Sequence, residues 1–470
     1  MCHDRDVRLI GLARDRGAPA ELLLRLLAMD CEEIWFALCG RAQLPDMVTD
    51  AIVAHPIRTI RWAFSKNLRI GPEKRSRLAD DPDPRIRAAL VEHCVYRYHV
   101  ATLTPRTPLT VEAYERLAAD PEVVVREEVA LQHYTPDHVR ALLTADPSPA
   151  VRVCLAESWW LLTDEVKDAL LNDPDTAVRR AAEKERDEEH NGKVVSLRPG
   201  SEISAHDAER AALPRPLAKR LARHADSRLR AAVAANPRLP ADLIAELAVD
   251  PDAEVRLAVS ARPGLTEEQR AAIDYRLDPD KMFRPLIWVR ELCDDQRAMR
   301  ECAESAHPSL RRSAACCPHL PPDLVERLAA DEDFVVRLFL AENHPEPPGA
   351  LLLRTVLEFE GYTQGMMLDN PNFPREGLRR FADSPHPDER RLVPLDLGTP
   401  AEEIERLSHD NDRRVRQAMA RDPRLSTGRL LELLAEKETA EAAAGNPALP
   451  ITVMKQILNG FVEEPEPSPA

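Results

Sequence analysis

Small apolar residues recur along the chain at the spacing of one helix face, in short stretches bounded by proline. In the stretch 250–262, the residues Val255, Ala258 and Val259 follow the i, i+3, i+4 pattern, which predicts a short helix with one narrow buried stripe. Asp250 is the expected N-cap of this helix, because the proline that follows it suits the first helical position. The leucine-rich stretch before Asp250 predicts a partner helix.

This pair of helices is one copy of a sequence repeat. Each copy carries an Asp-Pro pair, an aliphatic-Arg pair and an x-Pro-x-Leu turn, and the Arg marks the register. The register positions are Trp35, Arg61, Arg87, Arg126, Arg152, Arg179, Arg230, Arg256, Arg284, Arg311, Arg337, Gln364, Arg390, Arg416 and Ala440. Eleven of the 14 spacings are 26 to 28 residues, so the sequence predicts about fifteen repeats of ~26 residues.

One repeat is too small to bury both of its apolar stripes, so neighbouring repeats must stack into an α-solenoid. The DPxxVRxA signature resembles HEAT-like repeats, and the motif NPRLPADLIAELA at 236–248 is similar to the leucine-rich repeat variant family. The second resemblance covers roughly residues 20–460. It implies a right-handed superhelix of short helices whose surface binds other macromolecules. We therefore expect an all-α fold, a single elongated superhelix without a β-sheet.

Two stretches lack the repeat pattern. The polar segment 183–212 replaces a full repeat between Arg179 and Arg230, and we expect an exposed insertion or linker there. The predicted organisation is an N-terminal half of the solenoid over 1–182, this linker, and a C-terminal half over 213–460. The last residues, 461–470, contain three Pro and three Glu, which predicts a disordered tail.

Composition narrows the partner and the compartment. Aromatic residues make up only 4% of the chain, so the core must be mainly aliphatic. The formal net charge of −16 disfavours a protein that neutralises phosphates, and it makes nucleic acid an unlikely ligand. Only nine of the 64 basic residues are Lys, which together with abundant Ala and Pro indicates GC-rich codon usage and a bacterial source. No stretch reaches the length of a membrane span, so we expect a soluble cytoplasmic protein without a membrane partner.

The register Arg residues have two interpretations. They could bind phosphate along one face, or they could hold the repeats together. The structural interpretation is favoured because Asp stands six residues earlier in eight repeats. A guanidinium can bond the carbonyls of the preceding loop and a neighbouring Asp at once, which would tie each repeat to the next. We expect Arg87, Arg152, Arg256 and Arg337 to be buried or bonded within the protein.

The sequence offers no active site. Nucleophile-elbow, phosphate-loop and paired-carboxylate motifs are absent, so we expect a non-enzymatic protein. The family resemblance raises the question of an iron–sulfur cluster, because the leucine-rich repeat variant family includes a member with an N-terminal cluster. Cys2, Cys31 and Cys39 lack CxxC spacing, so no cofactor is expected and a cluster-carrying protein is a lesser alternative. All nine Cys are expected to be reduced thiols, several of them in the core.

The expected function is binding of a protein or peptide on the concave face of the solenoid. The candidate partner-binding residues are either apolar or arginine side chains just after the register position, or tryptophans in the Trp-Trp pair of one turn. They are Trp62, Val153, Trp159, Trp160, Leu257, Arg312, Leu338 and Arg391. The Trp-Trp pair has a second interpretation as a plug under the following insertion. The alternative function is nucleic-acid binding, as in the HEAT-like DNA-alkylation repair glycosylases.

Overall fold

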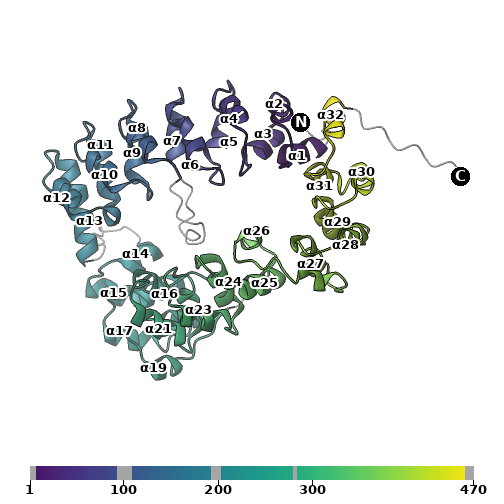
Figure 1. The fold of residues 1–470 in the computed structure, drawn as a ribbon. Coiled ribbons are helices and arrows are strands. Elements are labelled where there is room, and N and C mark those ends of the chain that lie inside the picture. Colours follow the sequence, from purple (N-terminus) through teal and green to yellow (C-terminus); the bar gives the residue numbers. More distant parts are fainter. Residues whose placement is uncertain (1–6, 93–107, 192–202, 279–282, 461–470) are drawn as a thin grey trace. The chain divides into compact units, whose positions relative to one another are not determined.

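The computed structural model describes residues 7–92, 108–191, 203–278 and 283–460. These residues form 32 α-helices and four 3₁₀-helices without a β-strand, so this part of the chain is all-α as expected (Figure 1). The helices divide between two compact units. Unit 1 comprises Met1–Cys94, Arg106–Leu161 and Pro374–Ala470, and unit 2 comprises Val95–Pro105 and Leu162–Phe373. The predicted tail at 461–470 lies outside the described residues.

The helices of unit 1 are α1 (Val7–Arg14), α2 (Ala20–Leu27), α3 (Glu32–Cys39), α4 (Asp46–Val53), α5 (Arg58–Ser65), α6 (Pro72–Arg75), η1 (Ser76–Asp80), α7 (Pro84–Val91), α8 (Val111–Ala118), α9 (Val123–Leu131), α10 (Asp137–Leu143), α11 (Pro149–Glu157), η2 (Trp159–Leu161), η3 (Leu378–Phe381), α27 (Pro387–Arg390), η4 (Val393–Leu395), α28 (Ala401–Leu407), α29 (Arg413–Ala420), α30 (Thr427–Ala435), α31 (Ala440–Ala444) and α32 (Ile451–Asn459).

The helices of unit 2 are α12 (Asp164–Leu171), α13 (Thr176–Asn191), α14 (Ala205–Arg210), α15 (Arg215–Ala222), α16 (Ser227–Ala235), α17 (Ala241–Leu247), α18 (Ala253–Ser260), α19 (Glu267–Ala271), α20 (Ile287–Glu291), α21 (Gln296–Glu304), α22 (Pro308–Ala314), α23 (Pro322–Ala329), α24 (Phe334–Asn343), α25 (Gly349–Glu358) and α26 (Gln364–Asp369).

In unit 1 the helices that carry the register residues contact one another in sequence order. Helix α3 contacts α5, α5 contacts α7, α7 contacts α9, and α9 contacts α11. The intervening helices pack on them from one side, as α8 does on α9 and α10 on α11. The side chains of Ile60, Ile86, Val125 and Val151, each just before a register Arg, are buried between the helices.

The N-caps of the register helices lie two residues later than expected. In α18 the cap is Asp252, whose carboxylate accepts the Glu254 N–H at 2.9 Å, and the predicted cap Asp250 stands outside the helix. Asp250 has another role, because its carboxylate accepts two bonds from Arg230, at 2.8 and 3.0 Å. The Asp-Pro pair therefore belongs to the junction between repeats.

The register Arg residues join consecutive repeats, which confirms the structural interpretation. Arg126 Nη1 donates to the backbone oxygen of Asp120, six residues earlier, at 2.6 Å. Its Nε and Nη2 donate to the Asp146 carboxylate of the next repeat, at 2.7 and 3.1 Å. The carboxylate six residues earlier thus serves the preceding Arg. The same two-sided arrangement holds at Arg61 with Asp81, Arg87 with Asp120, Arg230 with Asp250, Arg311 with Asp331, and Arg390 with Asp410.

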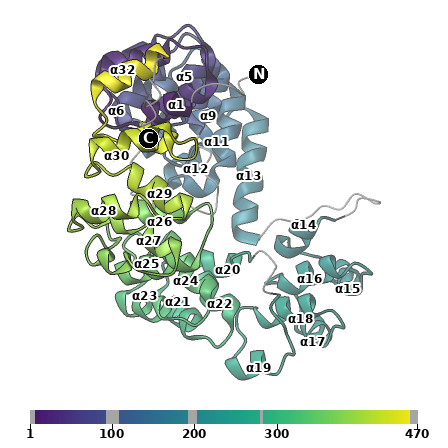
Figure 2. The same ribbon diagram turned by 90° about the vertical axis from the view of Figure 1, so that its right-hand side faces the viewer.

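The first and last helical pairs of unit 1 pack against each other. Helix α1 contacts α31 and α32, and α2 contacts α32 (Figures 1 and 2). Gly11 allows this approach, because a Cβ there would overlap the Glu441 carbonyl oxygen and lie 2.8 Å from the Ala444 Cβ. Arg14 forms an ion pair with Glu441 across the same junction. The expectation of an elongated array with two free ends is therefore wrong for these helices.

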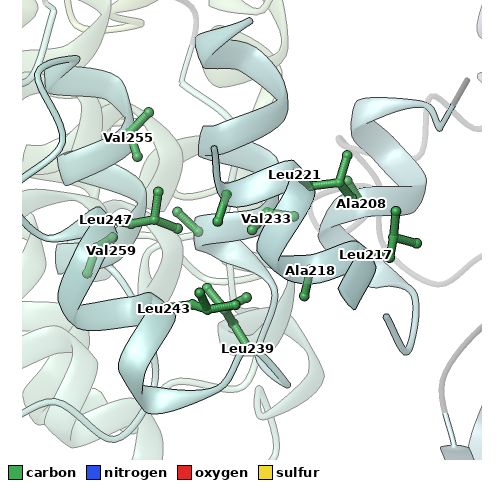
Figure 3. Close-up of a cluster of buried hydrophobic side chains, with 12 residues drawn as sticks. Ala208, Leu217, Ala218, Leu221, Val233, Leu239, Leu243, Leu247, Val255 and Val259 are labelled. Atoms are coloured by element: carbon green, nitrogen blue, oxygen red, sulfur yellow. The ribbon is translucent and has the colours of Figure 1, made fainter. Parts of the chain in front are cut away.

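The segment 183–212 is more ordered than expected. Residues 183–191 continue α13, because this stretch of Ala, Glu, Lys and Arg contains no Gly or Pro to stop the helix. Residues 205–210 form α14, which Ser204 caps by accepting the Asp207 N–H at 3.1 Å. Ala208 of α14 belongs to the core of α15–α18 (Figure 3). The expectation of an exposed loop is wrong for these two stretches, and 192–202 lies outside the described residues.

One pair of cysteines differs from the expectation of reduced thiols. Cys293 and Cys317 form a disulfide in unit 2, with a Cα–Cα distance of 5.4 Å that lies within the usual range. They are 24 residues apart and carry no motif, so the sequence gives no sign of the pairing. Cys31, Cys39 and Cys302 are free and buried, in agreement with a packing role.

Candidate functional site

The predicted partner-binding residues are divided between the two compact units. Trp62, Val153, Trp159, Trp160 and Arg391 lie in unit 1. Leu257, Arg312 and Leu338 lie in unit 2. They are therefore described separately below.

The Trp159-Trp160 pair splits into one buried and one exposed ring. Trp159 is 4% exposed, which fits the plug interpretation for this side chain. Trp160 is 68% exposed and stacks on the His133 ring, with 5.5 Å between the centroids. Burial and the nearby Arg140 lower the pKa of His133, so its ring is neutral near pH 7 and presents an apolar face to Trp160.

The arginine candidates already have partners within the protein. Arg312 Nε donates to the Asp333 carboxylate at 2.6 Å, and its guanidinium lies 5.5 Å from the centre of the Phe283 ring. Arg391 forms an ion pair with Asp388 at 3.2 Å. Leu338 is buried, whereas Leu257 is half-buried. These four side chains offer less free surface to a partner than the sequence position alone indicates.

Trp62 lies on a broader surface of unit 1 that the sequence reading captured only in part. Phe36 on α3 and Trp62 on α5 occupy the same repeat position, just after the register residue, and are 46% and 43% exposed. On α9 and α11 this position holds Glu127 and Val153, both half-buried. Because these helices contact one another in order, the side chains line one surface, which we call the α3–α11 face.

Carboxylates gather at the C-terminal ends of the helices of this face. Lys66 on α5 donates to the Glu92 carboxylate at 2.9 Å and to the backbone oxygens of Ala89 and Glu92 at 2.9 and 3.0 Å. Glu128 lies nearby on α9, where burial and then repulsion from Glu92 raise its pKa. Helix C-termini also carry partial negative charge, so this end of the face favours a cation.

Cys154 on α11 completes this acidic end. Burial, followed by repulsion from Glu127, Glu157 and Glu128, raises the pKa of its thiol to about 11. The thiol is therefore protonated at neutral pH and is a poor nucleophile. The face combines two exposed aromatic rings with a group of carboxylates, and this chemistry suits binding rather than covalent catalysis.

A serine and a histidine that sequence analysis did not connect meet inside unit 2. Ser260 Oγ lies 2.9 Å from His307 Nε2, although the two residues are 47 positions apart. The Ser309 N–H donates to His307 Nδ1, so the neutral ring carries its proton on Nε2 and donates it to Ser260. Ser260 in turn donates to the Leu257 carbonyl oxygen at 2.9 Å. The histidine cannot take the serine proton in this arrangement, and both side chains are buried.

The sequence reading missed Phe36 and the carboxylates around Glu128. Phe36 follows Trp35, a register position without Arg, and it was not compared with Trp62. Among the described residues, no group of three or more His, Cys, Asp or Glu side chains could hold a metal ion. None of the described helices has the length and apolar character required to cross a membrane.

Compared with known proteins, the sequence matches no protein-family model and no curated protein. The function is therefore argued from the surface itself.

Proposed function

We propose that the protein is a non-enzymatic α-solenoid of the HEAT-like, leucine-rich repeat variant type that binds a protein or peptide partner on the α3–α11 face. The partner segment is extended and carries both apolar and basic side chains. The observation that supports this is the exposure of Phe36 and Trp62 beside the carboxylates of Glu92, Glu127, Glu128 and Glu157.

The apolar part of the argument rests on the two aromatic rings. Neither ring is needed to fill the core, since the side chains of Ile60 and Phe64 on α5 are fully buried without them. Large aromatic side chains are enriched among the residues that dominate binding energy at interfaces. Phe36 and Trp62 therefore act as anchors for apolar side chains of the partner.

The basic part of the argument rests on charge. Lys66 answers one of the four carboxylates, and Arg85 adds a second cation on the first turn of α7. The remaining negative charge lies where the helix dipoles also favour cations. A nucleic acid would bring phosphates to this surface, and the carboxylates would repel them.

Selection from a random library of displayed dodecamer peptides tests this proposal. We expect enriched peptides to have a net positive charge and at least two aromatic or aliphatic residues. Their affinity is expected to fall about 10- to 30-fold in Trp62→Ala, the loss typical of an interface anchor. The triple variant Glu127→Gln, Glu128→Gln, Glu157→Gln should weaken the same peptides and reduce the salt dependence of binding.

Trp160→Ala is the matched control, because it removes an exposed tryptophan outside the α3–α11 face. It should leave the affinity of the selected peptides unchanged. Enrichment of acidic peptides, or binding that survives Trp62→Ala and fails in Trp160→Ala, would refute the proposal. A selection that enriches no peptide, together with tight binding of duplex DNA, would favour the nucleic-acid function instead.

A further inference from the structure

Junctions between repeats share a second device besides the register Arg. A side chain six residues after the register position donates to backbone oxygens at the C-terminal end of the preceding register helix. Asn67 Nδ2 donates to the oxygens of Cys39 and Arg41, at 2.6 and 2.7 Å. The same capping bonds are made by Arg41, Asn236, Arg262 and Asn446. We call this position the capping position.

The contact between α1 and α31 has the form of an ordinary junction. Leu9 in α1 stands 26 residues before Trp35, so α1 and α2 form a further helical pair in register with the rest. The capping position of this pair is Asp15. Its neighbour Gly17 lies directly against the last repeat, because a Cβ on Gly17 would be 2.9 Å from the Pro447 carbonyl oxygen.

Asp15 differs from the other capping residues because an ionised carboxylate has no proton to donate. Its side chain is fully buried, at 0% exposure. Oδ1 accepts the Gly17 N–H at 2.8 Å, while Oδ2 has no hydrogen-bond partner among the described residues. A buried carboxylate oxygen without a partner is costly, since it has lost its water without replacement.

Aspartate at another capping position shows what Asp15 lacks. Asp422 is held by Arg424 at 2.6 Å, and this arginine supplies the donors to the backbone oxygens of Asp396 and Thr399. Two residues after Asp15 the chain has Gly17, which has no side-chain donor. The junction between the last and first repeats is therefore without a permanent donor at its capping position.

We propose that Asp15 is a proton-operated latch between the last and first repeats. When protonated, its Oδ2–H donates to a backbone oxygen at the C-terminal end of α31, that of Ala444 or Asn446, which are the positions capped in other junctions. When ionised, it presents a bare negative charge to the same oxygens, and the contact between α1 and α31 weakens.

The surroundings of Asp15 favour the protonated form in the closed junction. Burial raises the pKa of Asp15 from 3.8 to about 6, against the lowering effects of the Gly17 N–H and of Arg41. Arg41 is the charged group from the segment after α3, and it donates to the Asp15 backbone oxygen at 2.7 Å. From α31 the charged group is Glu441, which pairs with Arg14 of α1 and has Arg421 beside it. From α2 it is Arg25, which bonds Asn459 of α32 at 2.8 Å.

The sign of the pH effect follows from the raised pKa. The closed junction binds the proton more tightly than the open one, so closure is favoured at low pH and weakens as the pH rises through about 6. With pKa values of 3.8 open and about 6 closed, the opening equilibrium shifts about tenfold between pH 5 and pH 7.5.

Hydrogen exchange of the full chain, measured by mass spectrometry and corrected for intrinsic rates, tests the latch. Peptides from α1, α31 and α32 should lose about tenfold in protection between pH 5 and pH 7.5, relative to peptides from α9. Asp15→Asn places the donor of Asn67 at this junction. It should remove the pH dependence and keep the junction protected at pH 7.5.

Two further variants separate the latch from general stability. Asp15→Ala should also remove the pH dependence but should leave the junction less protected than Asp15→Asn. Asn446→Asp should create a new pH dependence at the contact between α29 and α31, where Asn446 donates to Ala420 and Asp422. Protection that does not change with pH in the wild type, or an unchanged pH dependence in Asp15→Asn, would overturn the proposal.

Discussion

Replacing Arg126 by Ala is the sharpest test of how consecutive repeats are joined. The Arg126 and Asp146 side chains are only 9% and 3% exposed, and three guanidinium nitrogens are bonded between two repeats. Removal of the arginine leaves the Asp146 carboxylate buried with one remaining bond, from the Ser148 N–H at 2.8 Å. Breaking a buried ion pair in this way costs about 3 to 5 kcal/mol.

Because stability in a repeat array is local, the assay should be local too. Hydrogen exchange in α9 and α11 should accelerate by about two to three and a half orders of magnitude in Arg126→Ala, since about 1.4 kcal/mol corresponds to a factor of ten. Arg126→Lys should give an intermediate loss, because an ammonium cannot bond both repeats with fixed geometry. Adding Asp146→Asn to Arg126→Ala should recover part of the loss by removing the unpaired charge.

The matched control is Arg223→Ala. Arg223 pairs with Glu246 at 2.7 Å, but these side chains are 57% and 37% exposed, so the expected cost is below about 1 kcal/mol. If Arg126→Ala accelerated exchange no more than Arg223→Ala does in its own helices, the buried register pairs would not hold the repeats together, and this reasoning would be refuted.

Two buried polar side chains give further predictions. The Tyr114 hydroxyl is buried without a hydrogen-bond partner in the described structure, so Tyr114→Phe should be neutral or stabilise by up to about 1 kcal/mol in urea denaturation. Burial, then Arg270 and Arg311, lower the pKa of His307 from 6.5 to about 4. The unfolded chain therefore binds the extra proton as the pH falls below 6.5, and His307→Asn should remove about 2 kcal/mol of the destabilisation between pH 7 and pH 5, measured by thermal unfolding at both pH values.

The helices and the register ladder could be predicted from the sequence because their signals are local and periodic. The choice of partner within the ladder could not. With a period of 26 residues, an Asp six residues before one Arg is also 20 residues after the preceding Arg, as Asp146 is after Arg126. The spacing fits both pairings, and only the geometry of the junction selects the carboxylate of the next repeat.

The binding surface and the contact between the ends of unit 1 had weaker signals. Phe36 and Trp62 fall on one surface only because α3 packs on α5, and the carboxylates join them from other helices. The contact of α1 with α31 depends on how the array curves, which is the sum of many small rotations between repeats. A single glycine, Gly11, is the local trace of it, and a glycine in a helix has several explanations.

The contact between α1 and α31 also has a consequence for synthesis of the chain on the ribosome. Gly11 is made 430 residues before Glu441, its neighbour in the folded protein. At roughly 5 to 20 residues per second, the N-terminal helix waits about 20 to 90 s for its partner. During this time the surface that α1 later buries against α31 is exposed to other nascent chains. Chaperone capture of the nascent N-terminal segment should therefore persist until the last repeat has left the ribosome.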